Sequence, residues 1–374
     1  MKGLFLVFHG ISAHSGISKK IAAQCQALCR CGVTMQLCYL RVMPDGARQR
    51  LVDECVIADF GGGVRGRVLH RVCFDDVVSY VRTHGIDFLY VRYDHNPTPF
   101  TIHFLREMKR EKVQIALEIP TYPYDCEARG QALSIRFKLF IDRCFRQRFM
   151  RYVDRIVTFS DDEQIFGCPT IRISNGVDFS QIPLVHAKEP TADFYLLGVA
   201  NIHAWHGFDR VLAGLAVYYR QSQSQCVRFI LVGDGDSKLL DAYRNTIRES
   251  GLESYVEITG PLAGDALDAV FNRCDLGVGS LARHRSGIQK IRTLKNREYA
   301  ARGIPFIYSE CDDDFDLQPY VMKIAADESP LDIEAVVRFR QSLSLTPAAI
   351  RATVEGALSW DRQMEQVVQQ MDRI

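Results

Sequence analysis

The sequence predicts an α/β protein with two doubly wound domains, each built on a parallel sheet, and a cleft between them. A chain of 374 residues is longer than one hydrophobic core usually supports, so two domains are expected. Short apolar runs typical of strands alternate with amphipathic stretches typical of helices, which indicates consecutive βαβ units. The alternation occurs in two series separated by a polar segment, and each series therefore predicts one domain.

The predicted strands divide between the two halves of the chain. The first series lies at residues 4–8, 34–40, 88–93, 113–119 and 155–159, with helical patterns at 19–31 and 98–111 between them. The second series lies at residues 194–199, 226–232, 256–259, 275–279 and 305–308. The polar segment at residues 181–193, with Pro183 and Pro190, reads as a linker. We therefore expect an N-terminal domain at residues 1–182 and a C-terminal domain at residues 191–357.

The bulk composition is that of an ordinary globular protein. Apolar residues make up 47% and charged residues 24%, and a net charge of +1 gives no general attraction to nucleic acid. No run of eighteen apolar residues exists and the apolar N-terminal run is too short for a signal peptide, so we expect a cytoplasmic protein. The twelve cysteines lack Cys-x-x-Cys spacing, and Cys25, Cys29, Cys144 and Cys226 stand at apolar helix and strand positions. This predicts buried free thiols and neither disulfides nor a zinc site.

The most informative stretch lies at residues 294–309. It reads as a charged helix that ends at Gly303, followed by Pro305 and a short apolar strand. Glu298 is therefore placed on a rigid helix. On spacing alone, a single carboxylate surrounded by Lys and Arg is more often a solvated surface charge.

Glu298, Gly303 and Pro305 resemble the second half of the signature of family 4 glycosyltransferases, which are retaining enzymes of the GT-B fold. The string at residues 201–210 resembles a bacterial polysaccharide-synthesis branch of that family, and residues 174–178 resemble its domain-closing strand. The resemblance implies two Rossmann-like domains, the first of them completed by a C-terminal helix at about 358–374. It also implies a nucleotide-sugar donor in the second domain, with Glu298 accepting hydrogen bonds from the ribose hydroxyls.

The chain departs from this family at the positions that usually handle the donor sugar and the diphosphate. The first signature glutamate is replaced by Lys290, and the usual Arg and Lys of the pyrophosphate clamp are replaced by Asn201 and His206. The resemblance therefore implies that other cations stabilise the leaving group, and we expect Arg285, Lys290 and Lys295 to do so. The further donor-binding candidates are Asn201, His206, Gly233, Thr259 and Gly260, with Gly16 and Ser18 in a small-residue loop that opens a helix of the first domain.

Candidates for the acceptor side follow two predicted strands of the first domain. Tyr122, Tyr124 and Glu127 follow the strand at 113–119, and Asp94 and His95 follow the strand at 88–93. Ligands bind at the carboxyl ends of strands in open α/β sheets, and tyrosine rings suit sugars. The alternative is that prolines stiffen the first loop while its tyrosines cap the core. No general base is assigned, and Asp94 and His95 are the substitutes for a histidine that the family places near the end of the strand that here ends at residues 118–121.

Two charged segments have competing interpretations. Residues 135–152 interleave Arg and Lys with aromatic residues, and Asp142 is the only acid. This pattern predicts either a helix that docks on anionic lipid or a surface helix whose apolar face packs on the sheet. The acidic string at residues 311–316 is expected to be a solvated loop in preference to a metal site, and we expect no metal or other cofactor.

The resemblance implies a hexosyltransferase-type enzyme that moves a sugar from a nucleotide-sugar donor to a saccharide or lipid-linked saccharide acceptor. We expect this activity in the biosynthesis of a cell-surface polysaccharide such as a capsule, at the inner face of the membrane. Two alternatives keep the fold: another GT-B enzyme, such as an epimerase or an inverting transferase, and a sugar-nucleotide-binding protein without activity. A two-domain dehydrogenase is disfavoured because the first loop lacks Gly-x-Gly-x-x-Gly spacing.

Overall fold

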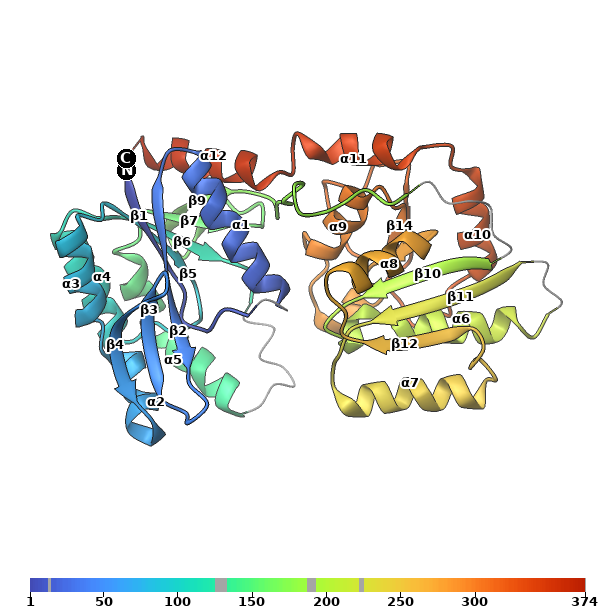
Figure 1. Cartoon of the computed structure of the whole chain (residues 1–374), viewed down its shortest axis with the longest axis horizontal. Helices are drawn as coiled ribbons and strands as arrows, with labels where there is room; N and C mark the ends of the chain where they lie inside the picture. The colour runs from blue at the N-terminus through green and yellow to red at the C-terminus, as the bar shows by residue number, and fades with distance from the viewer. Residues whose placement is uncertain (13–14, 125–132, 187–192, 222–224, 374) are drawn as a thin grey trace. The chain divides into compact units, whose positions relative to one another are not determined.

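The computed structural model describes residues 1–12, 15–124, 133–186, 193–221 and 225–373. The chain forms two compact units, one made of Met1–Gly176 with Trp360–Ile374 and the other of Val177–Ser359 (Figure 1). Each unit has a largely parallel sheet covered by helices on both faces, which confirms the predicted α/β fold. Within the described ranges, no helix is long and apolar enough to cross a bilayer.

The first unit is built on a sheet with the strand order β4-β3-β2-β1-β5-β6-β7-β9-β8. Its strands are β1 (Lys2–Leu6), β2 (Thr34–Val42), β3 (Arg48–Val52), β4 (Cys55–Gly61), β5 (Phe88–Arg92), β6 (Gln114–Ile119), β7 (Arg155–Thr158), β8 (Gln164–Ile165) and β9 (Cys168–Arg172). The central strands are parallel, whereas β3 and β4 form an antiparallel edge that the sequence analysis missed.

Helices cover both faces of this sheet because side chains alternate along each strand. The helices are α1 (Gly16–Arg30), α2 (Gly63–Val72), α3 (Asp75–His84), α4 (Pro99–Arg110), α5 (Leu133–Met150) and α12 (Trp360–Met371). Leu4 and Leu6 pack in one core with residues of α3, α4 and α5. Phe5 points to the opposite face and packs with residues of α1 and α12.

The C-terminal helix α12 is an integral part of the first unit and lies beside α1 (Figure 1). Trp360 is buried against Gly176, where an added Cβ atom would lie only 2.5 Å from the ring. The side chain of Gln363 accepts a hydrogen bond of 2.7 Å from the backbone N–H of Ser174. The last residues of the chain therefore complete the core that the first 176 residues begin.

The second unit is built on a parallel sheet with the strand order β12-β11-β10-β13-β14-β15. Its strands are β10 (Asp193–Val199), β11 (Cys226–Val232), β12 (Val256–Gly260), β13 (Leu276–Val278), β14 (Phe306–Tyr308) and β15 (Val321–Lys323). Its helices are α6 (Phe208–Tyr218), α7 (Ser237–Glu249), α8 (Asp265–Arg273), α9 (Leu294–Arg302), α10 (Ile333–Ser342) and α11 (Pro347–Glu355). Residues of α6, α7 and α10 cover one face, and residues of α8, α9 and α11 cover the other.

Two expectations about local environments are correct only in part. All cysteines in the described part of the chain are free, but Cys29 and Cys144 are exposed because they lie on the outer faces of α1 and α5. The acidic string at residues 311–316 is solvated only in part, because Cys311 and Asp313 are exposed and Asp312 is buried. Asp312 is fully buried and lies 2.7 Å from the fully buried guanidinium of Arg297, and Lys290 lies 2.5 Å from Asp313. Cations from the segment leading into α9 and from α9 itself therefore neutralise this string.

Replacing Arg297 with Met is expected to lower the free energy of unfolding of the second unit by about 3–5 kcal/mol, because it leaves the buried Asp312 without its partner. Trp205 and Trp360 are the two tryptophans of the chain, so a Trp360→Phe background reports the second unit alone by fluorescence during urea unfolding. The control is Arg338→Met, which removes an exposed pair with Glu334 on α10 and is expected to change stability by about 0.5 kcal/mol or less. Equal losses in the two variants would contradict this account.

Candidate functional site

The candidate site lies at the carboxyl ends of β10, β13 and β14, where open parallel sheets bind their ligands. Hydrogen bonds tie the loops that follow these strands to one another. The backbone N–H of Leu281 donates to the carbonyl of His206 at 2.9 Å, and that of Ser309 donates to Ser280 at 2.8 Å. The helix α9 begins at this same edge of the sheet, so the side chains of its first turn lie among the three loops.

The candidate glycines and Thr259 bring two further strand ends to this edge. Gly233 has a φ of 131°, and a Cβ atom there would lie 1.8 Å from the carbonyl oxygen of Ala200. The turn after β11 can therefore pack against the turn after β10 only with glycine at this position. The N–H of Gly233 donates to Gly260, and the hydroxyl of Thr259 donates to the same carbonyl at 2.8 Å.

Lys295 places an enclosed amine at the start of α9. Its stem is partly exposed, but Nζ is buried and has no hydrogen-bond partner among the described residues. Nζ lies 5.7 Å from the centre of the Phe208 ring. Burial lowers the pKa of Lys295 from its usual range, Glu310 opposes that shift, and Arg283 adds to it. An anion placed beside this amine would raise the pKa again.

Glu310 places a buried carboxyl group on the other side of the same turn. Its Oε1 accepts a hydrogen bond of 3.2 Å from the Asn296 amide and a longer one of 3.5 Å from the Thr293 hydroxyl. Its Oε2 has no partner within the described ranges. Burial raises the pKa of Glu310, against the opposing influence of Arg283 and Lys295.

Four buried polar atoms without hydrogen-bond partners, as far as the structure describes the chain, concentrate at this edge. They are Ser280 Oγ, Lys295 Nζ, Asn296 Oδ1 and Glu310 Oε2. The Asn296 oxygen would lie 2.9 Å from a Cβ atom at Gly279, which places it next to Ser280. Each unmade bond costs about 1–3 kcal/mol, so such a concentration is expected where the fold serves a ligand.

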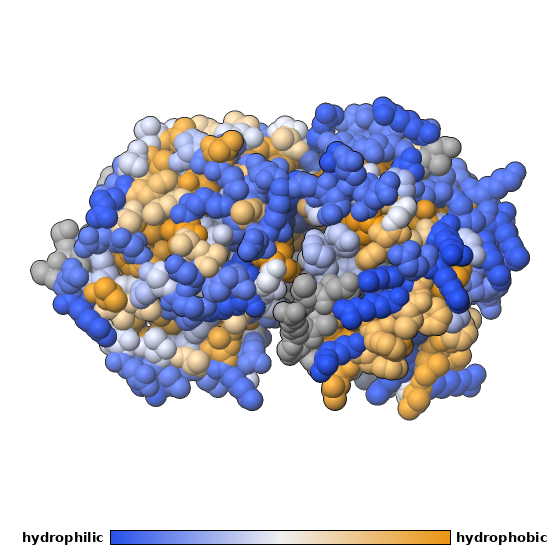
Figure 2. Space-filling model, turned by 180° about the vertical axis from the view of Figure 1, so that it is seen from behind, coloured by the Kyte–Doolittle hydropathy of each residue, from blue (hydrophilic) through white to orange (hydrophobic). Residues whose placement is uncertain are grey.

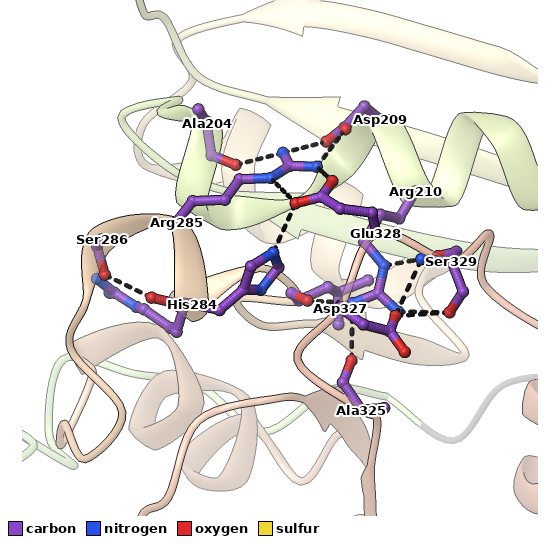
Figure 3. Close-up of polar contacts among 12 residues, drawn as sticks. Ala204, Asp209, Arg210, His284, Arg285, Ser286, Ala325, Asp327, Glu328 and Ser329 are labelled. Carbon is purple, nitrogen blue, oxygen red and sulfur yellow. Dashed lines mark hydrogen bonds and ion pairs between the residues drawn. The ribbon is translucent and has the colours of Figure 1, made fainter.

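Arg285 is already engaged within the unit (Figure 3). Its guanidinium donates to both carboxylate oxygens of Asp209 at 2.9 and 2.7 Å, and to the carbonyl of Ala204 at 2.8 Å. It also pairs with Glu328, and together with His284 it lowers the pKa of that exposed carboxyl to about 2. Arg285 therefore holds the loop at residues 283–286 to α6 and to the loop at residues 325–329.

Arg210 reinforces the same junction from α6 (Figure 3). Its buried guanidinium donates to the carbonyls of Ser329 and Ala325 at 2.7 and 2.8 Å and to Asp327 at 2.9 Å. It also donates to the carbonyl of Leu281 at the end of β13. The two arginines act as cross-links between segments that are far apart in the sequence.

Lys290, the remaining predicted cation, and Glu298, the predicted ribose ligand, also have partners. Lys290 pairs with Asp313, so its charge is matched by an acid. Glu298 uses Oε1 to accept from Arg302 at 3.0 Å, and Arg302 pairs in turn with Asp268. The Glu298 side chain is about one-third exposed, and no hydrogen bond involves its Oε2 in the part of the chain that the structure describes.

The loop after β10 holds neutral rings where the family resemblance leads one to expect permanent charges. His206 is buried and its Nδ1 accepts from the backbone N–H of His203 at 3.0 Å. Burial lowers the pKa of His206 well below its usual value, with Lys295 and Arg283 adding to the effect. The His203 ring stacks on Trp205 with centroids 4.1 Å apart, and Asn201 is exposed beside them.

In the first unit, the helix-opening loop is built around Ser18. Its buried hydroxyl accepts a hydrogen bond of 3.0 Å from the backbone N–H of Ser12, and its own N–H donates to Ser15 at 3.4 Å. Gly16 begins α1, and a Cβ atom there would meet nothing within 4 Å. Ser18 therefore shapes the loop, and Gly16 lies where a ligand has room to approach.

The acceptor-side candidates fall into different environments. Tyr124 is buried in the core and donates a hydrogen bond of 3.0 Å to the buried Asp142, so the reading that its ring caps the core is correct. Tyr122 is only partly buried, and Asp94 pairs with Lys138 at 2.9 Å. His95 has a φ of 48° and its ring lies 4.2 Å from that of Tyr124. Glu127 lies outside the described residues.

Glu310, Asn296 and Ser280 are site residues that the sequence analysis missed. Ser280 lies just beyond β13 and Glu310 just beyond β14, so the rule that ligands bind at strand ends would have found both. Asn296 gives no such signal, because a polar residue in a charged helix is ordinary.

The chain is similar in fold to solved structures of glycosyltransferases. Sucrose-phosphate synthase from Thermosynechococcus elongatus has a TM-score of 0.67 at 14% identity, covering 100% of this chain and 98% of its own. HepE from Anabaena, solved with UDP, has a TM-score of 0.64 at 15% identity, covering 100% of both chains. The catalytic domain of starch synthase IV from Arabidopsis thaliana, solved with ADP and acarbose, has a TM-score of 0.63 at 11% identity, covering 100% and 98%.

The likeness is one of architecture. No protein-family model matches the sequence, and no curated protein matches it either. The similar structures align with the full length of the chain but have a low sequence identity to it. The two units therefore have the two-domain α/β architecture of GT-B glycosyltransferases.

Proposed function

We propose that the protein is a retaining glycosyltransferase of the family 4 type. It moves a sugar from a nucleotide-sugar donor to a saccharide or lipid-linked saccharide acceptor in the biosynthesis of a cell-surface polysaccharide. The observation that carries the proposal is the enclosed amine of Lys295, which has no hydrogen-bond partner among the described residues and lies at the ligand-binding edge of the second sheet. The structures of HepE with UDP and with UDP-glucose support it by fold.

The start of α9 suits a diphosphate for two physical reasons. Thr293 precedes the helix without capping it through its side chain, so backbone N–H groups of the first turn are available to an anion. Lys295 adds a cation in the same turn. A charge that develops on the leaving diphosphate is therefore stabilised by helix and lysine together, without a metal ion.

Glu298 extends this site along the helix. Residues three apart lie on one face of a helix, so the Glu298 carboxylate stands about one turn beyond the Lys295 amine. Its second oxygen is available to ribose hydroxyls in the proposed complex. Arg285 and Lys290, whose charges are matched by Asp209, Glu328 and Asp313, contribute to the field at the leaving group and position its loops.

The alternatives make different products. An epimerase or an inverting transferase shares the fold, and the anomeric configuration of the sugar product separates these enzymes from a retaining one. A binding protein without activity would hold the donor and release no product. Transfer or donor hydrolysis above background excludes that alternative.

Replacing Lys295 with Met is expected to weaken the binding of a nucleoside diphosphate about 10- to 100-fold, because a charged hydrogen bond contributes about 1.5–3 kcal/mol. UDP, GDP, ADP and dTDP are compared first by the rise in Tm that each gives the wild type. Glu298→Gln should weaken the binding of the same nucleotide, whereas Lys238→Met, at an exposed lysine of α7, should leave that binding unchanged. Unchanged affinity in Lys295→Met would refute the proposed site.

We also propose that α5 brings the enzyme to an anionic membrane surface. Leu133, Phe137 and Phe140 expose 78%, 64% and 61% of their surface, and Arg136 and Arg143 are exposed beside them. Figure 2 shows hydrophobic and hydrophilic residues interspersed on one face of the molecule. Asp142, the acid of this helix, is buried and bonded to Tyr124. Exposed aromatic and basic side chains suit the lipid headgroup region.

The wild type is expected to sediment with vesicles of phosphatidylglycerol and phosphatidylcholine, and not with vesicles of phosphatidylcholine alone. The double substitution Phe137→Ser with Phe140→Ser should abolish pelleting, because it removes the apolar anchor. The matched control is Val64→Ser with Val68→Ser, which changes two exposed apolar residues of α2. Equal pelleting of the three proteins would rule out docking through α5.

A further inference from the structure

Glu310 and Lys295 form an unusual pair of buried ionisable groups. Both Oε2 of Glu310 and Nζ of Lys295 are enclosed, and neither has a hydrogen-bond partner among the residues that the structure describes. Glu310 accepts a hydrogen bond of 3.2 Å from Asn296, the residue that follows Lys295 in the first turn of α9, so both groups belong to this turn. They nevertheless form no ion pair within 4 Å of each other. The two groups are therefore near neighbours that form neither a hydrogen bond nor an ion pair with each other.

Glu310 is held rigidly in this position. The next residue, Cys311, forms a parallel bridge with Lys290, in which the N–H of Cys311 donates to Gln289 at 2.8 Å. The amine of Lys323 donates to the backbone carbonyl of Glu310. Oε1 is fixed by Asn296, so one carboxyl oxygen is anchored and the other remains for a ligand.

The chemistry of the two groups selects a hydroxyl as their common partner. Lys295 in its charged form can only donate hydrogen bonds, and the Glu310 carboxylate can only accept them. A hydroxyl accepts from the amine through its oxygen and donates its proton to the carboxylate. An ionised phosphate satisfies the amine alone and is repelled by the carboxylate, so it cannot bridge the pair.

The order of the side chains along α9 indicates which hydroxyl this is. Glu310 contacts Thr293 and Asn296 at the beginning of the helix, and Glu298 lies further along it. Lys295 lies in that same first turn, so Glu310 and Lys295 stand at the start of the helix and Glu298 stands further along it. In a nucleotide sugar, the sugar and the diphosphate likewise lie on the same side of the ribose.

We propose that Glu310 determines donor specificity by accepting a hydrogen bond from a hydroxyl of the transferred sugar, next to the diphosphate that Lys295 holds. This inference rests on the proposed function. The Lys295 ammonium has three N–H donors, so it can donate to the diphosphate and also to the sugar hydroxyl from which Glu310 accepts. Glu310 thereby supplies an acid to the donor site at a position other than residue 290, where the chain carries lysine.

The test compares each nucleoside diphosphate with its sugar conjugates in Glu310→Gln, which keeps the size of the side chain and removes its charge. The pairs are UDP with UDP-glucose and UDP-galactose, GDP with GDP-mannose, and ADP with ADP-glucose, all measured by calorimetry. Because the loss of the Glu310 charge also acts on the diphosphate through Lys295, the free diphosphate is the reference, and we expect the variant to lose about tenfold more affinity for the preferred sugar conjugate than for the free diphosphate. The control is Glu249→Gln, at an exposed position at the end of α7.

An equal loss for diphosphate and sugar conjugate, or no loss for either, would overturn the assignment of Glu310 and leave the proposed function standing. A wild type that binds none of these nucleotides would instead refute the proposed function itself. Should Glu310→Gln fail to fold, deoxyfluoro analogues of the preferred sugar donor test the same point on the wild type. One analogue should then lose about tenfold in affinity, and equal affinity for all of them would overturn the proposal.

Discussion

Charge matching around helix α9 is the constraint on which the second unit depends. The buried pair of Arg297 with Asp312 fixes the helix to the loop that follows β14. Breaking such a pair leaves a buried charge without compensation, so the fold holds this loop firmly in place. That loop carries Glu310, and the preceding turn of α9 carries Lys295. The structural pair thus sets the position of the two residues whose bonding capacity remains for a ligand.

The neighbouring cations have a different task. Arg285 and Arg210 cross-link α6, the end of β13 and the loop at residues 325–329. Their charges are paired with Asp209, Asp327 and Glu328, so the two arginines shape the site and contribute to its electrostatic field. The neutral histidines in the loop after β10 lie at the same edge of the sheet. In the proposed function, the net charge at the diphosphate therefore depends mainly on the ionisation of Lys295.

Much of the fold could be predicted from the sequence because parallel strands are uniformly apolar. The strand predicted at residues 226–232 is β11 with the same bounds, and those at 194–199 and 113–119 differ from β10 and β6 by one residue. The edge hairpin of β3 and β4 was missed because its residues alternate with many polar ones. The exposed Cys29 and Cys144 were misplaced because apolar spacing alone does not show which face of a helix is buried.

The site could be predicted only in part. Strand ends and the helix at residues 294–302 indicated its location, and the structure brings Lys295, Gly233 and Thr259 to one sheet edge. The partners of the other cations could not be predicted, since Asp209 and Glu328 lie 76 and 43 residues from Arg285. Burial of Glu310 and Asp312 was equally hidden, because a run of acids in a sequence is usually solvated.

The central claim is that Lys295 is the cation that meets the diphosphate, and proton linkage tests it most directly. Burial lowers the pKa of the free lysine, and a bound anion raises it, so binding must take up protons between the lowered pKa and the ordinary value of about 10.4. Calorimetry at about pH 8 in buffers of different ionisation enthalpy measures this uptake for whichever of UDP, GDP and ADP binds most tightly. The account predicts proton uptake by the wild type and, because arginine stays charged, less uptake with retained binding in Lys295→Arg. Equal proton uptake by the two proteins, or none by the wild type, would contradict it.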